Sequence, residues 1–312
     1  MHLLTEGPVL DSEIDALGHM NVRFYLARID QAGAGLLAAL GINAVGCTET
    51  VVRRVDTYSR FSREQFADSH LQVLGGVLAV NGDQVQCYFE IRNPAKDQLA
   101  ASFITVNELI DKSTQQRLVL PQGLMCENSQ YLVELPDYSA PRSLTLDAPR
   151  TDITLAELES RITAAPAAGM MSGRFECTLE AQDCDANGYL LDGLDLMFVM
   201  FRALAVKEGR SFGPPVLQTD EGTRMGWAMI ETRAMALGRP RVGDQLVSVG
   251  ADITFGDRWR QSRRWAFIAS SGEMIGINDT VGIALDLDAR RSIIIPPSVR
   301  KTLEDACLPD LA

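Results

Sequence analysis

The sequence has few of the residues from which metal and redox centres are built. It contains only three His, and its six Cys are scattered, with no two at the C-x-x-C spacing of a zinc or redox motif. A His-rich metal site is therefore nearly excluded, and we expect no metal and no other cofactor. Free thiols are typical of a reducing compartment, so the cytoplasm is the expected location.

Long hydrophobic runs are also missing. No uninterrupted apolar stretch reaches the roughly 18 residues of a transmembrane helix, and the first residues lack the pattern of a signal peptide. Lysine is scarce, with four Lys against 25 Arg, and the net charge is −12. Because an acidic surface repels phosphate backbones and anionic lipids, we expect neither a nucleic acid nor a membrane as a partner.

Three common enzyme motifs are either absent or found outside their required setting. The patterns GxGxxG and GxxxxGK[ST], which cradle nucleotide phosphates, do not occur in the required setting. The pattern GxSxG, which carries the nucleophilic serine of α/β-hydrolases, occurs once, as GRSFG at 209–213, but it follows a helical segment and precedes two prolines instead of joining a strand to a helix. The sequence therefore argues against a nucleotide-binding enzyme and against a serine hydrolase of that design.

What is present is sufficient for two globular domains, with 312 residues of which 46% are hydrophobic. Two helical segments, 21–40 and 190–208, carry apolar residues at helical spacing. Each is followed by strand-like segments without another convincing helix, which indicates an antiparallel sheet. The predicted strands cover residues 47–62, 71–80, 85–93, 99–110, 225–237, 245–255, 263–270 and 274–287.

The order of one helix and one antiparallel sheet occurs twice. The motif DALG at 15–18 matches DANG at 185–188, an offset of 170 residues. Later in the chain the offset drifts by a few residues, with 66–73 corresponding to 241–249. This repeat predicts an internal duplication.

The duplication sets the expected domain boundaries. We predict an N-terminal domain at 1–125, a linker at 126–170 and a C-terminal domain at 171–312. The linker is rich in Pro, Ser and Asp, and a short helix is expected near 153–163 with Asp152 as its N-cap.

The residues that carry chemistry gather on the loop that enters the first helix. Asp15, His19 and Asn21 bring a carboxylate, an imidazole and an amide together there. The start of a helix also offers free N–H groups and a partial positive charge, which stabilise a developing oxyanion. A carboxylate at such a place can act as a general base or as a nucleophile on an acyl carbon. In the alternative interpretation, Asp15 only orders a turn and Asn21 only caps the helix.

The pattern Asp-x-x-Gly-His-x-Asn, with Tyr25 four residues after Asn21, resembles the signature of hotdog-fold acyl thioesterases of the hydroxybenzoyl-CoA thioesterase-like superfamily. The duplicated chain is similar to double-hotdog acyl-ACP thioesterases. The resemblance implies an α+β fold of two tandem hotdog domains. Each would be a long central helix wrapped by an antiparallel sheet, and the two would pack as an intrachain pseudo-dimer.

The resemblance also implies roles for single residues. Asp15 matches the carboxylate that attacks the thioester carbonyl or activates a water molecule, and His19 and Asn21 match positions that orient the substrate or the water. Asp30 matches an acidic position of the family, although an ion pair with Arg23 or Arg28 is a structural alternative. The expected oxyanion and substrate-binding positions are Gly18, Val22 and Tyr25.

The second copy of the motif departs from the pattern. Asp185 and Gly188 are retained, but Tyr189 and Leu191 stand where the first copy has the imidazole and the amide. The second half contains no His that could serve as a base, which argues against catalysis by Cys184. We therefore predict that the second half-site is degenerate.

The expected function is hydrolysis of an acyl-CoA or acyl-carrier-protein thioester without a metal. Two alternatives remain: a hotdog dehydratase or hydratase acting on 3-hydroxyacyl or enoyl thioesters, and a non-catalytic protein that binds acyl thioesters. Two Arg clusters either hold substrate phosphate groups or are solvated strand faces. These clusters are Arg53, Arg54, Arg60 and Arg63, and Arg258, Arg260, Arg263 and Arg264.

We expect a monomer or a weak homodimer, because a duplicated chain supplies both halves of a hotdog dimer by itself. Light scattering over a dilution series measures the mass of the particle directly. A large obligate assembly that loses activity on dilution would contradict this expectation.

Overall fold

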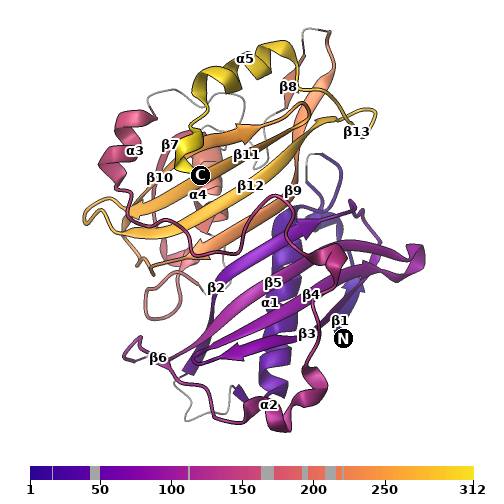
Figure 1. Cartoon of the computed structure of the whole chain (residues 1–312), viewed down its shortest axis with the longest axis vertical. Helices are drawn as coiled ribbons and strands as arrows, with labels where there is room; N and C mark the ends of the chain where they lie inside the picture. Colours follow the sequence, from indigo (N-terminus) through magenta and orange to yellow (C-terminus); the bar gives the residue numbers. More distant parts are fainter. Residues whose placement is uncertain are drawn as a thin grey trace. The chain divides into compact units, whose positions relative to one another are not determined.

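The computed structural model describes residues 1–15, 17–42, 50–111, 113–162, 172–191, 196–207, 216–219 and 221–312. The chain divides into two compact units, Met1–Arg142 and Ser143–Ala312. Each unit consists of an antiparallel sheet with helices at its faces and edges (Figure 1).

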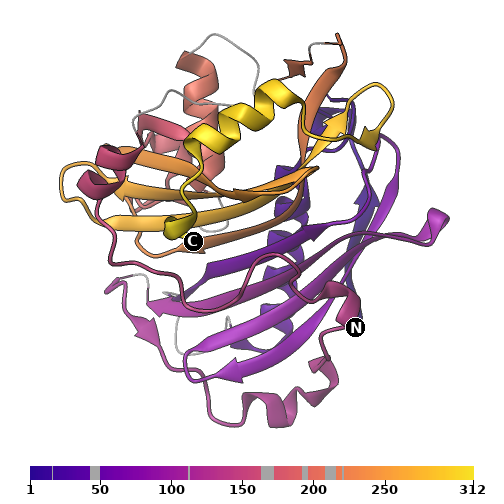
Figure 2. The ribbon, with the colours of Figure 1, turned by 45° about the horizontal axis from the view of Figure 1, so that its top comes forward.

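The first unit combines one long helix with a five-stranded antiparallel sheet. Within it the strand order is β1-β3-β4-β5-β2, and the short β6 pairs with the end of β5. Helix α1 (Val22–Ala39) lies along one face of this sheet, as Figures 1 and 2 show. The strands are β1 (His2–Pro8), β2 (Thr50–Phe61), β3 (His70–Asn81), β4 (Gln84–Asn93), β5 (Gln98–Asp111) and β6 (Arg117–Leu118). The short helices are η1 (Asp11–Glu13), η3 (Pro94–Lys96), α2 (Leu124–Glu127), η4 (Ser129–Tyr131) and η5 (Asp137–Ser139).

Local sequence signals determine where α1 begins and ends. The side chain of Asn21 accepts a hydrogen bond from the Arg23 amide at 3.1 Å, so Asn21 is the N-cap. At the other end Gly41 has a φ of +75°, a conformation that glycine adopts without strain. The predicted helix 21–40 is therefore confirmed. The buried residues recur at helical spacing on one face: Tyr25, Leu26, Ile29, Ala32, Leu36 and Leu37.

The second unit repeats this architecture. Its strand order is β7-β10-β11-β12-β9, which is the order of the first unit strand for strand, and β13 pairs with β12 as β6 pairs with β5. The strands are β7 (Gly173–Thr178), β8 (Leu217–Gln218), β9 (Arg224–Ala236), β10 (Gln245–Phe255), β11 (Trp259–Ile268), β12 (Met274–Asp286) and β13 (Arg291–Ser292). The helices are α3 (Leu155–Arg161), η6 (Ala181–Asp183), α4 (Leu196–Lys207), α5 (Pro297–Ala306) and η7 (Pro309–Leu311).

The two sheets also share their strand register. In the first unit Val77 of β3 lies opposite Cys87 of β4, and in the second Asp252 of β10 lies opposite Ser262 of β11, 175 residues later in both strands. A β-bulge directly follows both Val77 and Asp252. Corresponding residues of the two sheets can therefore be compared position by position.

This comparison shows that several apolar residues on the helix-facing side of the first sheet correspond to charged residues in the second. Phe89 faces α1, since a Cβ on Gly33 would lie 3.5 Å from its ring. The residue 175 positions later is Arg264, which has no exposed surface and donates to Ser248 Oγ at 2.8 Å. Burial lowers the pKa of Arg264 to about 9.

The same substitution pattern continues along the strands. Where the first unit has Val77 and Val85, the second has Asp252 and Arg260, which form an ion pair of 3.5 Å. Both residues are buried, and burial raises the pKa of Asp252. At these positions the second unit thus buries charged residues where the first buries apolar ones, and the charges must be compensated by ion pairs and hydrogen bonds.

The opposite face of the first sheet is covered by the chain that leaves it. Glu90 of β4 is buried and accepts hydrogen bonds from the hydroxyl groups of Tyr88 at 2.7 Å and Tyr138 at 2.6 Å. It also accepts from Arg92 Nε at 2.5 Å, and the Tyr88 hydroxyl lies 2.6 Å from Ser139 Oγ. These contacts attach η5 to the sheet.

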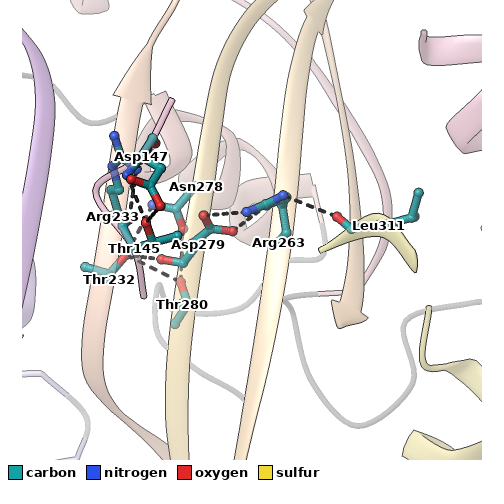
Figure 3. A network of polar contacts seen from close by, with 9 residues as sticks. All are labelled: Thr145, Asp147, Thr232, Arg233, Arg263, Asn278, Asp279, Thr280 and Leu311. Carbon is teal, nitrogen blue, oxygen red and sulfur yellow. Dashed lines mark hydrogen bonds and ion pairs between the residues drawn. The ribbon is translucent and has the colours of Figure 1, made fainter. Parts of the chain in front are cut away.

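The corresponding face of the second sheet is covered in a similar way. Arg233 of β9 donates to the carbonyl oxygens of Thr145 at 2.9 Å and Asp147 at 2.7 Å. Figure 3 shows Arg263 between Asp279, which it pairs with at 2.6 and 3.0 Å, and the carbonyl oxygen of Leu311. In each unit a segment outside the sheet is therefore attached through buried charged residues.

Two predicted helix starts are wrong. Helix α4 begins at Leu196, whereas the prediction began at 190; Leu190 instead forms an isolated β-bridge with Cys184. Apolar periodicity cannot locate this start because Leu190 is an apolar, partly buried residue in the bridge as well. The predicted end at 208 lies outside the described residues.

The linker helix begins later than predicted. Thr154, and not Asp152, caps α3, because its hydroxyl accepts from the Glu157 amide at 3.2 Å. Asp152 pairs instead with Arg150 at 2.7 Å.

The predicted strands are confirmed to within a few residues where the structure describes them, although positions 47–49 lie outside that part. The prediction missed the edge strands β1 and β7 and the helix α5. Strand β11 begins at Trp259, four residues before its predicted start. Edge strands carry polar residues on their exposed side, so the alternation of apolar and polar residues that predicts a strand is weak in them. In the described residues, no helix has the length and apolar character needed to span a membrane.

The Glu90 network predicts an acid-sensitive stability. Although burial by itself raises the pKa of Glu90, hydrogen bonds from Arg92, Tyr138 and Tyr88 hold it below its ordinary value. The ionised carboxylate therefore stabilises the folded state at neutral pH, and this contribution is lost as the pH falls through the lowered pKa. We expect Glu90→Gln to flatten the acid-side decrease in the free energy of unfolding, measured by urea titration between pH 7 and about pH 3. An unchanged slope would contradict this role.

Candidate active site

The motif loop at the start of α1 closes on itself through its backbone. The Asp15 amide donates to the His19 carbonyl oxygen at 3.0 Å, and the Gly18 amide donates to the Asp15 carbonyl oxygen at 2.9 Å. Gly18 has a φ of +80°, which a residue with a Cβ adopts only with strain. The loop therefore holds the Asp15 and His19 backbones in one geometry.

The carboxylate of Asp15 is held from two sides, and its side chain is only 8% exposed. Its Oδ1 accepts from the Leu17 amide at 2.9 Å, and its Oδ2 accepts from Asn21 Nδ2 at 3.2 Å. The Asn21 side chain thus binds Asp15 through its nitrogen while its oxygen caps α1. Two of the three predicted polar groups are in direct contact.

The imidazole of His19 lies between two carboxylates. Its Nδ1 is 3.9 Å from Asp15 Oδ2 and 3.2 Å from the Met20 carbonyl oxygen, and its Nε2 is 3.6 Å from Glu64 Oε1. Each ring nitrogen therefore has a carboxylate within 4 Å. A ring in this position can exchange a proton with a reacting group.

Glu64 is a candidate site residue that the sequence prediction missed. It lies on the connection between β2 and β3, and its side chain is 34% exposed. It stands 45 positions after His19 with no motif around it, so spacing gives no signal. Only the fold brings it to the motif loop, where the Met20 amide donates to the carbonyl oxygen of the next residue, Gln65, at 2.8 Å.

The backbone amides at the start of α1 are only partly free. The Asn21 amide donates to the Glu13 carbonyl oxygen at 2.9 Å, and the Arg23 amide donates to Asn21 Oδ1. Among the described residues the Val22 amide faces no hydrogen-bond acceptor. Of the helix-start amides, the one at Val22 is therefore the candidate oxyanion donor.

Two further predicted positions pack inside the unit. Tyr25 is buried, and its ring meets Phe61 edge-on at a centroid distance of 5.6 Å. Asp30 forms an ion pair with Arg54 of β2. The ion pair of Asp30 in the structure is thus with Arg54, while Arg28 reaches Glu13 at 2.8 Å.

The loop in the second unit has the same backbone and a different side-chain environment. Its Asp185 amide donates to the Tyr189 carbonyl oxygen at 2.7 Å, and Gly188 has a φ of +78°. Asp185 Oδ1 accepts from the amides of Asn187 and Tyr189 at 2.9 and 3.0 Å. Its Oδ2, however, accepts from Arg239 Nη2 at 3.0 Å, where the first unit uses the amide of Asn21.

Arg239 occupies the position that corresponds to Glu64, 175 residues later. The guanidinium groups of Arg239 and Arg241 lie 4.8 and 4.3 Å from the centre of the Tyr189 ring. The histidine and glutamate of the first unit are therefore replaced by a tyrosine and an arginine, and the ion pair neutralises the Asp185 carboxylate.

The Arg clusters are mostly used within their own units. In the first cluster Arg53 pairs with Glu108 at 3.1 Å, and in the second Arg263 pairs with Asp279. Arg63 is exposed beside Glu64 and donates to the Ser62 carbonyl oxygen at 3.3 Å. In the part of the chain that the structure describes, no three His, Cys, Asp or Glu side chains are grouped closely enough to hold a metal ion.

The comparisons with known proteins fit this site. The sequence model of the thioesterase-like superfamily matches residues 9–127, which include the motif loop, α1 and Glu64. No curated protein matches the sequence. The resemblance to hotdog acyl thioesterases that the motif predicts is thus confirmed.

Two solved structures extend the likeness to most of the chain. An acyl-ACP thioesterase from Bacteroides thetaiotaomicron has 10% identity and a TM-score of 0.62, and the match covers 89% of this chain and 96% of that one. The 12:0-ACP thioesterase from Umbellularia californica has 9% identity and a TM-score of 0.61, with 90% and 93% covered. At this identity the likeness shows a shared hotdog-type fold.

The left-handed turn of the motif loop makes a stability prediction. Gly18→Ala should lower the free energy of unfolding by about 1–2 kcal/mol, because a Cβ is strained at positive φ. Gly35→Ala is the matched control, since Gly35 lies in α1 with nothing within 4 Å of an added Cβ. It should raise the stability by about 0.5–1 kcal/mol. Urea unfolding measures both changes in free energy. Equal effects of the two substitutions would refute the strain expected at Gly18.

Proposed function

We propose that this chain, which matches the thioesterase-like superfamily over its first unit, hydrolyses an acyl thioester at the motif loop. The observation that carries the proposal is the imidazole of His19 between the carboxylates of Asp15 and Glu64. This cluster offers a base or nucleophile, a proton donor and an adjacent helix start, which are the groups that acyl transfer requires. The substrate is an acyl group on coenzyme A or on a carrier protein.

In this proposal each of these groups has one role in the reaction. Asp15, held by Asn21 and Leu17, attacks the thioester carbonyl or removes a proton from an attacking water. The Val22 amide donates to the oxyanion that forms on the carbonyl oxygen. His19 gives a proton to the departing thiolate, and the Glu64 carboxylate, 3.6 Å from its Nε2, orients the imidazole for that transfer. Where Asp15 itself attacks, water then hydrolyses the mixed anhydride that results, so both routes give a carboxylic acid and a free thiol.

The second half-site is proposed to be inactive. The Asp185 carboxylate pairs with Arg239, and Tyr189 cannot serve as a proton donor of histidine type near neutral pH. Without an imidazole the leaving thiolate has no donor there. One working site per chain follows from this arrangement.

We further propose the domain assignment, with hotdog domains at 1–125 and 171–312 joined by the linker 126–170 and paired as an intrachain pseudo-dimer. The identical strand order of the two units and their common register support it. The likeness to acyl-ACP thioesterases over about nine-tenths of the chain supports it as well. A stable monomer in solution would agree with it.

Release of free thiol tests the proposed activity. The purified chain is mixed with a panel of acyl-CoAs and acyl-carrier proteins that differ in chain length, and the thiol is measured with a disulfide reagent. Hydrolysis of at least one thioester supports the proposal. Hydration of an enoyl-CoA without thiol release would instead support a hydratase, and tight binding without turnover would support an acyl-thioester-binding protein.

Paired substitutions locate the working half-site. Asp15→Asn keeps the shape of the side chain but removes its charge and basicity, so it should lower kcat by about a hundredfold or more. Asp185→Asn should leave kcat within about twofold, because the same change falls on a neutralised carboxylate. Glu64→Gln should lower kcat by about tenfold or more through loss of charge beside His19. The measurement is kcat at saturating substrate.

Thermal melts accompany these assays, so that loss of folding is not mistaken for loss of chemistry. The opposite ranking, with Asp185→Asn inactive and Asp15→Asn unchanged, would place the active site in the second half of the chain. Persistence of hydrolysis in both variants would disprove the carboxylate mechanism.

A further inference from the structure

The segment that carries Glu64 is anchored on both sides. Before it, the amides of Ser62 and Arg63 both donate to the carbonyl oxygen of Ala100 in β5, at 2.8 and 3.2 Å. After it, the carbonyl oxygen of Gln65 accepts from the Met20 amide. The position of the Glu64 carboxylate therefore depends on how Gln65 is held.

The Gln65 side chain is buried and both ends of its amide are bonded. Its Oε1 accepts from Asn93 Nδ2 at 2.9 Å, and its Nε2 donates to the Arg63 carbonyl oxygen at 3.3 Å. Gln65 thus links the end of β4 and the motif loop.

Asn93 has little reason to be polar except for this contact. It is buried at the end of β4, and its Oδ1 has no hydrogen-bond partner among the described residues. Its side-chain contact is the one to Gln65. Keeping a buried amide oxygen unsatisfied costs stability, so an apolar residue would suit a purely structural position better.

The second unit has such an apolar residue. The positions that correspond to Gln65 and Asn93 are Pro240 and Ile268. The backbone contact is nevertheless retained, because the Leu190 amide donates to the Pro240 carbonyl oxygen at 3.0 Å. The fold therefore needs the backbone contact in both units, whereas the amide pair occurs only beside the complete motif.

We infer that Gln65 and Asn93 form a positioning pair that holds the Glu64 carboxylate toward the His19 imidazole. The pair acts through Glu64 and does not touch the substrate. The effect of the pair on kcat rests on the proposed function, whereas its effect on the position of Glu64 relative to His19 does not. A misplacement of a reacting group by about 1 Å can lower the rate about a hundredfold. A pair that positions the residue next to Glu64 can therefore control turnover.

Kinetics test the inference through coupling to Glu64. Gln65→Met and Asn93→Leu should each lower kcat by about tenfold with KM within about twofold, and the double variant should cost no more than either. In the Glu64→Gln background, Gln65→Met should cause no further loss. An additive loss in that background would show that Gln65 acts by another route and would overturn the inference.

A spectroscopic readout tests the same geometry without turnover. The chain has three His, so the ring resonances of His19 can be assigned by substitution. Gln65→Met should move these resonances as Glu64→Gln does. An unchanged His19 signal in Gln65→Met would overturn the inference whether or not the chain hydrolyses thioesters, and absence of thiol release by the unmodified chain would refute only the proposed function.

Tyr88→Phe is the matched control. It also removes a buried hydrogen-bonding group from β4, but on the face opposite to α1, where Tyr88 contacts Glu90 and Ser139. It should lower the melting temperature and leave kcat and the His19 resonances unchanged. A loss of kcat equal to that of Gln65→Met would mean that general destabilisation explains both, which would also overturn the inference.

Discussion

The contact on which the candidate site depends is the hydrogen bond that the side-chain Nδ2 of Asn21 donates to the Asp15 carboxylate. The same side chain caps α1 through its oxygen, so one residue connects the start of the central helix to the reacting carboxylate. A cap stabilises a helix by about 1 kcal/mol. Stability of the helix and orientation of Asp15 are therefore coupled, and neither can change without the other.

The two units show how little of this arrangement the fold itself requires. Both loops have the same β-bridge, the same left-handed glycine and a carboxylate at the same position. In the first unit the carboxylate receives an amide, whereas in the second it receives the guanidinium of Arg239. A duplicated backbone thus tolerates either a neutral amide or a cationic guanidinium beside one aspartate, because backbone hydrogen bonds hold the loop in both units.

The residues that face the helix also differ between the two units. The first unit packs Val77, Val85 and Phe89 under its helix, and burial of apolar surface is the main term that stabilises such a core. The second unit has an aspartate and two arginines at these positions, and buried charges stabilise a fold only when they are paired. The complete motif thus occurs in the unit that keeps these three positions apolar.

The sequence by itself determined the helix at 21–40, most of the strands, the duplication and the motif Asp15, His19 and Asn21, because each depends on neighbouring residues or on a repeat. It could not locate the edge strands, the start of α4, Glu64 or the Gln65–Asn93 pair. These depend on contacts between residues far apart in the chain, such as the 45 positions between His19 and Glu64. Strand register decides those contacts, and register results from the packing of the whole sheet rather than from any local pattern.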